Sequence, residues 1–137
     1  MKKFIIIFLV ISLSTVSLSN STAAKSVNVE EYFKDCEPTK EIVKFLLNHY
    51  NIKHADIVLK QAILETGWFK SHHCRINNNL FGFRGNKGFF FFFYYIQSIK
   101  AYKRFQDKKY KNGEDYYKFL IRINYAEGES YNKILKN

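Results

Sequence analysis

Apolar residues recur at three- and four-residue spacing along most of the chain after about position 38, a pattern that predicts α-helices. The first predicted helix follows Thr39, whose hydroxyl can cap it, and runs to about Tyr50. The second runs from about Ala55 to Glu65. It stops at Gly67, a residue type that suits the left-handed conformation that often ends a helix.

The second predicted helix carries a carboxylate on the side opposite its polar edge. At roughly 100° per residue, Asp56 and Lys60 share one edge, and Glu65 lies roughly 180° from Asp56, beside Gln61. Glu65 is therefore either a fraying helix-end residue in water or a carboxyl that lines a cleft. In a cleft, partial burial and the negative end of the helix dipole would both raise its pKa, which suits a general acid.

A glycine-rich turn in the middle of the chain predicts a β-hairpin. We expect residues 68–76 to be a short helical or irregular segment and Asn77–Asn79 to be a turn. Leu80–Arg84 and Phe89–Tyr95 then read as two strands that flank Gly85–Gly88. Phe89–Tyr95 consists only of aromatic residues and is apolar on both strand faces, so one face should pack on the helices. The other face could stack against sugar rings.

Three further helical segments are predicted after the hairpin. The first is Ile96–Lys108, the second begins at Gly113, and the third is Glu129–Leu135. The sum is a mainly α (α+β) domain with one small β-hairpin, whose helices wrap the Ala55–Glu65 helix.

The N-terminus has the pattern of a secretory signal peptide. Lys2 and Lys3 precede the apolar run Phe4–Ile11, and a Ser/Thr-rich stretch leads to Ala23 and Ala24. The apolar run is too short for an anchor helix, which needs about 20 apolar residues. We therefore expect residues 1–24 to be removed after Ala24. Residues 25–137, with a core at 38–137, would form one domain that is exported to the periplasm or the cell exterior.

The chain is strongly basic, with a formal net charge of +10. Removal of Lys2 and Lys3 would leave +8, which favours attraction to anionic surfaces such as cell-wall polymers or lipid headgroups. Export argues against nucleic acid as the partner. We expect a monomer that is associated with the cell wall and has no stable membrane span after signal cleavage.

Two cysteines, Cys36 and Cys74, remain in the mature chain. In an oxidising compartment this count is compatible with one disulfide between them. A nucleophilic Cys74 assisted by His72 or His73 is disfavoured, because residues so close in sequence rarely converge on one reacting atom. A zinc site is also disfavoured, because the spacings match no common structural pattern. We expect neither a metal nor a cofactor.

Two motifs give a resemblance to a known family. Gln61–Gly67, followed by Asn78–Gly82, resembles the signature of the glucosaminidase family of cell-wall hydrolases, glycoside hydrolase family 73. The resemblance begins near Pro38 and continues downstream through Ser98, Tyr102, Gly113, Tyr116, Phe119, Leu120, Tyr125, Ala126, Tyr131 and Leu135.

The resemblance implies a lysozyme-like α fold and endo-β-N-acetylglucosaminidase activity on peptidoglycan glycan strands. It also implies that Glu65 is the general acid that protonates the glycosidic oxygen. The substrate-binding residues that it implies are Gln61, Asn78, Asn79, Phe81 and Tyr125.

The chain departs from this family in lacking an acid where a second catalytic carboxylate is expected. No Asp or Glu occurs between Thr66 and Gln106, and Gln97 stands where relatives often carry an acid. Either the substrate's acetamido group acts as the nucleophile, or Asp107 folds back as the second catalytic group, or the protein is slow or inactive. The rival functions are a glycan-binding module without activity and a basic membrane-active protein that uses the Phe89–Tyr95 run.

Overall fold

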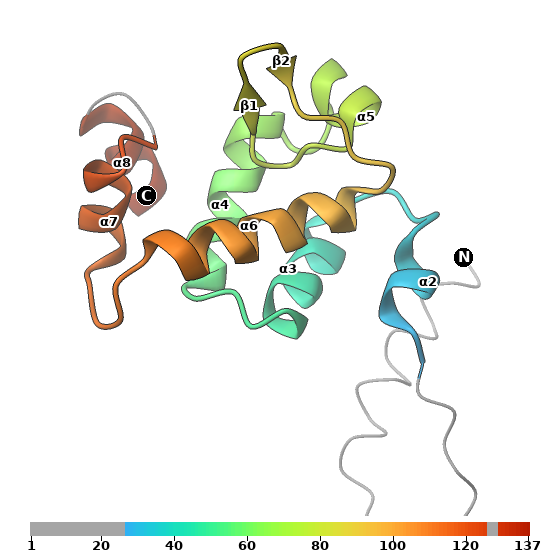
Figure 1. Ribbon diagram of the computed structural model, residues 1–137, viewed down its shortest axis with the longest axis horizontal. Coiled ribbons are helices and arrows are strands. Elements are labelled where there is room, and N and C mark those ends of the chain that lie inside the picture. The colour runs from blue at the N-terminus through green and yellow to red at the C-terminus, as the bar shows by residue number, and fades with distance from the viewer. Residues whose placement is uncertain (1–26, 126–128) are drawn as a thin grey trace, which may run out of the picture.

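The computed structural model describes residues 27–125 and 129–137 as a helical domain with one small hairpin (Figure 1). Its elements are, in chain order, α2 (Val29–Phe33), α3 (Lys40–His49), α4 (Ala55–Thr66), α5 (His72–Asn77), β1 (Arg84–Gly85), β2 (Gly88–Phe89), α6 (Tyr95–Lys109), α7 (Tyr116–Arg122) and α8 (Glu129–Lys136). The predicted class, a mainly α lysozyme-like fold with one hairpin, is confirmed.

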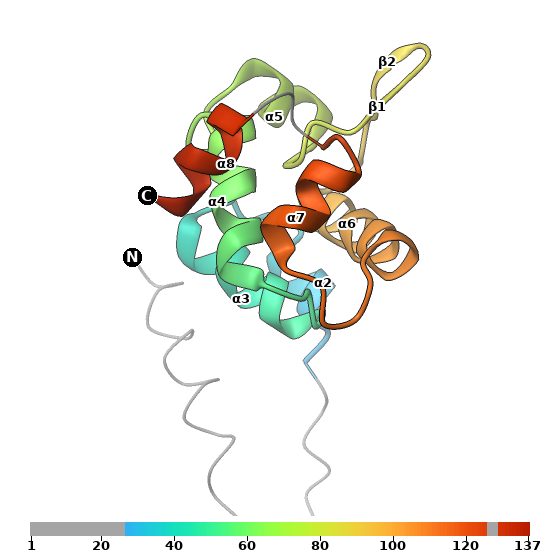
Figure 2. The same cartoon turned by 90° about the vertical axis from the view of Figure 1, so that its left-hand side faces the viewer.

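Helix α4 lies at the centre of the domain, as its apolar sequence predicts. It packs against α3 on one side and α8 on another, and α6 crosses it (Figures 1 and 2). The hairpin stands above the C-terminal end of α4, while α7 and α8 are both at the opposite end of the molecule from α2 (Figure 1). Val58 and Ala62 of α4 are fully buried, whereas Asp56 and Lys60 are exposed as the helical wheel predicts.

The predicted helix ends are confirmed at both tested positions. Thr39 Oγ1 accepts a hydrogen bond from the Ile42 amide at 3.2 Å and so caps α3. Gly67 has φ of 54° in the left-handed region, and the Trp68 amide reaches back to the Ile63 carbonyl at 2.9 Å. These bonds satisfy groups that the helix itself leaves unpaired.

The predicted long strand over Phe89–Tyr95 is wrong. The hairpin consists only of Arg84 paired with Phe89 and Gly85 paired with Gly88. Beyond Phe90 the backbone amides take acceptors outside the hairpin: Phe92 N donates to the Asn77 carbonyl and Phe93 N to Gln97 Oε1, each at 2.9 Å. Tyr95 already belongs to α6, one residue earlier than expected.

One short helix was not expected from the sequence. Val29–Phe33 forms α2, which precedes the core that the sequence predicts over residues 38–137. The Asn28 side chain accepts hydrogen bonds from the Glu30 and Glu31 amides and so caps this helix.

A buried polar network ties three helices together within the core. Tyr102 of α6 donates to Gln61 Oε1 of α4 at 2.9 Å, and its hydroxyl lies 2.6 Å from that of Tyr116 of α7. Gln106 Nε2 donates to both the Tyr116 hydroxyl and the Lys53 carbonyl. The aromatic and aliphatic core surrounds the hydrogen bonds among the four side chains and shields them from water, whereas the bond to Lys53 is only partly buried.

The predicted signal peptide, residues 1–24, lies outside the described residues, as does Ala126. Among the helices that the structure describes, none is long and apolar enough to cross a membrane.

Candidate active site

Glu65 lies in the last turn of α4, facing the hairpin and α8. Its Oε1 accepts a hydrogen bond from the Tyr131 hydroxyl of α8 at 3.1 Å. On the other side, a Cβ placed on Gly82 would be 3.1 Å from Glu65 Oε2. Gly82 also has φ of 64°, so glycine fits both the backbone and the narrow space beside the carboxyl.

The Glu65 side chain is reachable by solvent yet surrounded by protein. The residue counts as exposed, but burial of its carboxyl raises the pKa, and the Tyr131 hydrogen bond lowers it by less. The exposure belongs to the residue as a whole, whereas the raised pKa reflects the protein atoms around its carboxyl. A carboxyl with a raised pKa and an open approach can deliver a proton to a bound substrate.

Two tyrosines lie next to Glu65: Tyr131 of α8, and Tyr125 in the segment after α7. Burial, and then the charge of Glu65, raise the pKa of Tyr131, so its hydroxyl stays protonated and can donate. Tyr125 donates its hydroxyl to the Phe81 carbonyl at 3.1 Å, and its ring centroid lies 6.3 Å from that of Tyr131. The structure therefore brings Tyr125 close to Glu65, through Tyr131.

Tyr131 is the site residue to which sequence reasoning assigned no role. It is part of the family resemblance, but it lies 66 residues after Glu65. Only the packing of α8 against α4 brings the two together.

Two of the predicted substrate-binding residues, Asn79 and Phe81, are buried beside the site. Asn79 and Phe81 are each only 3% exposed. Asn79 Nδ2 donates to the Phe83 and Phe90 carbonyls, and its Oδ1 accepts from the Phe83 amide at 3.0 Å. These bonds hold the segment that carries Gly82 against Glu65.

Gln61 requires a correction, because it is fully buried and bonded to Tyr102. It cannot contact a glycan directly and instead fixes α4 to α6. Asn78 is half-buried, and its amide donates to the Phe92 and Phe93 carbonyls at 3.0 and 3.1 Å. Asn78 thus orders the residues after the hairpin.

The structure does not bring the proposed second carboxylate to Glu65. Asp107 is exposed on α6 and forms an ion pair with Lys103 one turn before it. Gln97 accepts hydrogen bonds from the Phe93 and Tyr94 amides at the start of α6.

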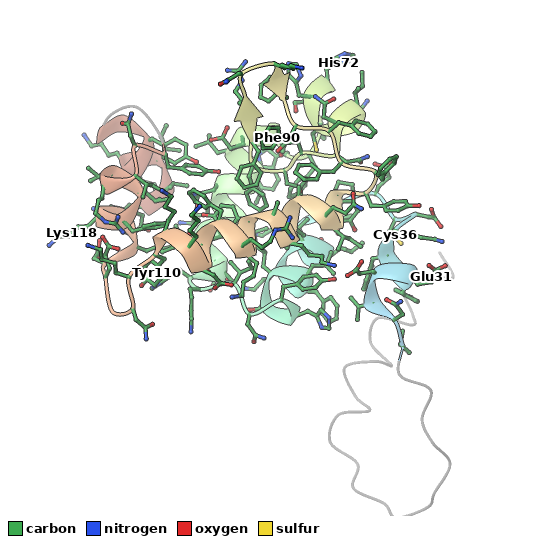
Figure 3. All side chains as sticks on the ribbon, viewed as in Figure 1. Glu31, Cys36, His72, Phe90, Tyr110 and Lys118 are labelled. Atoms are coloured by element: carbon green, nitrogen blue, oxygen red, sulfur yellow. The ribbon has the colours of Figure 1, made fainter. Side chains whose placement is uncertain are left out.

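Cys36 and Cys74 are free thiols in the structure, so the predicted disulfide is not formed there. Both line one pocket of about 680 Å³ between the end of α2 and α5; Figure 3 marks Cys36 at the end of α2. The Cys36 thiol donates to the Tyr32 carbonyl at 3.8 Å, and burial raises the pKa of the Cys74 thiol to about 11. A protonated, buried thiol is a poor nucleophile.

The two histidines beside Cys74 are exposed. The ring of His73 packs on that of Phe89, with 4.3 Å between the ring centroids. Across residues 27–125 and 129–137, no cluster of three or more His, Cys, Asp or Glu side chains is arranged to hold a metal ion.

Comparison with known families gives a match over most of the chain. Residues 40–137 match the Glucosaminidase family, described as mannosyl-glycoprotein endo-β-N-acetylglucosaminidase. This match covers most of the chain, and the chain belongs to this family of glycan hydrolases. No curated protein and no solved structure gives a significant match.

Proposed function

We propose that this protein is an exported endo-β-N-acetylglucosaminidase that cleaves β-1,4 bonds in peptidoglycan on the N-acetylglucosamine side. The observation that carries the proposal is the Glu65 carboxyl, which is open to a ligand, has a raised pKa and accepts a hydrogen bond from Tyr131. Membership of the Glucosaminidase family and the basic charge of the chain, which suits an anionic wall, support it.

In this mechanism Glu65 is the general acid. Tyr131 donates to Oε1, which leaves Oε2, on the Gly82 side, to carry the proton. That proton passes to the glycosidic oxygen as the bond to the anomeric carbon breaks. The Tyr131 hydrogen bond then stabilises the carboxylate that remains.

The substrate itself supplies the nucleophile in our proposal. Asp107 forms an ion pair with Lys103 on the surface, and Gln97 accepts hydrogen bonds from backbone amides. Neither residue therefore supports a two-carboxylate mechanism. The carbonyl oxygen of the substrate's 2-acetamido group attacks the anomeric carbon and forms a cyclic oxazolinium intermediate. Water then opens this ring and gives one proton to Glu65, which restores the acid and retains the anomeric configuration.

The test uses the protein as its host exports it, incubated with purified cell wall. Glu65→Gln keeps the shape and the Tyr131 contact but cannot donate the acidic proton. We expect fragment release to fall by at least a thousandfold. The thermal unfolding curve of the variant should keep the shape of the parent's curve. Glu41→Gln, at an exposed acid in the first turn of α3, is the matched control and should hydrolyse the wall like the parent. Wall lysis by the Glu65→Gln protein at the parent rate would refute the assignment.

A second candidate function is glycan binding without cleavage, favoured by the absence of a carboxylate partner for Glu65 among the side chains that the structure describes. Chromatography of muropeptides after prolonged digestion distinguishes the two. New N-acetylglucosamine reducing ends would show that the protein is an enzyme. Intact glycan chains, together with sedimentation of the protein with the wall, would show that it is a binding module.

A further inference from the structure

The segment between β2 and α6, residues 90–94, here called the aromatic loop, turns its rings away from the core. Phe90 is 50% exposed, Phe91 59% and Phe93 74%, and Tyr94 is exposed as well. Figure 3 shows Phe90 in front of the hairpin, and its ring covers Gly85, where an added Cβ would come within 2.7 Å of it. Adjacent large apolar side chains left in water usually mark an interaction surface.

The backbone of the aromatic loop is held by hydrogen bonds from its neighbours. Phe90 N donates to the Phe83 carbonyl and Phe92 N to the Asn77 carbonyl, each at 2.9 Å. The carbonyls of Phe90, Phe92 and Phe93 accept from the Asn78 and Asn79 amides. Such a loop can enter an apolar boundary without burying these polar groups unpaired, and its rings are already held outward.

Basic side chains surround the aromatic loop. Lys100 and Arg104 line one surface hollow with Phe92, and the Arg84 guanidinium lies 4.1 Å from the centre of the Phe89 ring. Arg75 and Lys34 line the neighbouring pocket with Phe93 and Tyr94.

Some of this charge is neutralised. Asp35 and Glu37 share the pocket with Arg75, and Lys34 and Lys100 are paired with acids of α2. Arg75, Arg84 and Arg104 form no ion pair with any acid that the structure describes. Exposed aromatics with a cationic rim on a basic protein match an anionic lipid surface.

The geometry of the rings favours lipid over glycan. Phe91 and Phe93 meet edge to face at 81°, so their faces do not form one flat platform for a sugar chain. Within the aromatic loop only Tyr94 carries a polar side-chain group, whereas a glycan site needs hydrogen-bonding side chains beside the stacked ring.

We propose that the aromatic loop and its basic rim dock the protein on a bilayer that contains anionic phospholipid. Phe91 and Phe93 enter the boundary between headgroups and acyl chains, and Arg75, Arg84 and Arg104 contact headgroup phosphates. Docking is separate from glycan cleavage and does not require Glu65.

The test is co-sedimentation of the exported protein with vesicles of phosphatidylcholine alone or mixed with phosphatidylglycerol. We expect binding to the mixed vesicles, with Phe91→Ser/Phe93→Ser lowering the partition coefficient at least tenfold. Arg75→Gln/Arg104→Gln should lower it about 25-fold, at about fivefold per charge, on the anionic vesicles only. Ile121→Ser, at an apolar residue of α7 that is 61% exposed, is the matched control and should bind like the parent.

Three outcomes would overturn the proposal. In the first, the parent does not sediment with the anionic vesicles. In the second, Phe91→Ser/Phe93→Ser binds them as tightly as the parent while keeping the parent's thermal unfolding curve. In the third, this double variant loses sedimentation with purified cell wall but keeps vesicle binding, which would make the aromatic loop a glycan site. Glu65→Gln should bind vesicles normally, so failure of the proposed hydrolase function would leave this test intact.

Discussion

At the residue scale, burial and the Tyr131 hydroxyl shift the pKa of Glu65 in opposite directions, and burial has the larger effect. The protonated form that a general acid needs therefore depends on the surrounding protein atoms. The hydrogen bond from Tyr131 acts after proton transfer, when it stabilises the carboxylate that remains.

Tyr131→Phe tests this balance. Removing the donor takes away the effect that lowers the Glu65 pKa, so the pKa should rise further and the alkaline limb of the pH–rate profile should move to higher pH. The rate constant should fall by about 10- to 100-fold, since a hydrogen bond to a charged group contributes about 1.5–3 kcal/mol. Tyr125→Phe removes a bond to the Phe81 carbonyl and should leave the alkaline limb where it is. An unmoved limb in Tyr131→Phe would contradict the assignment.

The raised pKa of Glu65 also predicts a pH-dependent stability change. A carboxyl whose pKa is raised in the folded state stabilises the fold below its unfolded pKa of about 4.3, and this contribution is lost as the pH rises through the folded pKa. Glu65→Gln should therefore raise the free energy of unfolding relative to the parent at about pH 7 but not at about pH 3. Urea unfolding at both pH values measures this, and a gain only at low pH would reverse the sign and contradict the prediction.

At the element scale, Asn79 determines the position of the hairpin. The hairpin has only two residue pairs, too few for independent stability, so it relies on side-chain hydrogen bonds from outside. The Asn79 amide bonds to both sides of the hairpin and keeps Gly82 beside Glu65.

Asn79→Ala should lower the free energy of unfolding by about 3 kcal/mol, because it removes the side-chain partner of the partly buried Phe83 amide and Phe90 carbonyl. Urea unfolding followed by circular dichroism measures this change. Asn86→Ala, at the exposed turn of the hairpin, is the control and should cost less than about 0.5 kcal/mol. Equal stability of the two variants would show that the hairpin does not need this amide.

At the scale of the whole molecule, the polar network of Gln61, Tyr102, Tyr116 and Gln106 fixes α4, α6 and α7 relative to one another. Since Glu65 follows Gln61 by one helical turn, the same network fixes where the candidate acid emerges.

Tyr102→Phe should lower the free energy of unfolding by about 2 kcal/mol, because Gln61 Oε1 and the Tyr116 hydroxyl lose a buried partner. The variant should also lose activity through misplacement of Glu65, with an unchanged pH optimum. Tyr117→Phe, at a half-buried tyrosine on α7, is the control and should change stability by less than about 0.5 kcal/mol. A parent-like unfolding curve for Tyr102→Phe would contradict a structural role for the network.

Local sequence was a good guide where a single element decides the outcome. The helical period of α3 and α4, the Thr39 cap and the Gly67 stop depend on residues a few positions apart, and the structure confirms them. The wheel position of Glu65, opposite Asp56, belongs to the same kind of inference. Motif resemblance supplied the family, which the match over residues 40–137 shows.

The sequence alone thus determined α3 and α4, the residues that end them and the candidate acid, because these depend on short-range periodicity and capping. Only the tertiary structure decided the partners of that acid, since Gly82 and Tyr131 reach Glu65 from elements far apart in the chain. It also decided that residues 90–94 are an exposed loop and not a strand. A run that is apolar on both faces fits either form. Here the backbone amides of Phe92, Phe93 and Tyr94 donate hydrogen bonds to the Asn77 carbonyl and the Gln97 side chain, which lie outside the run.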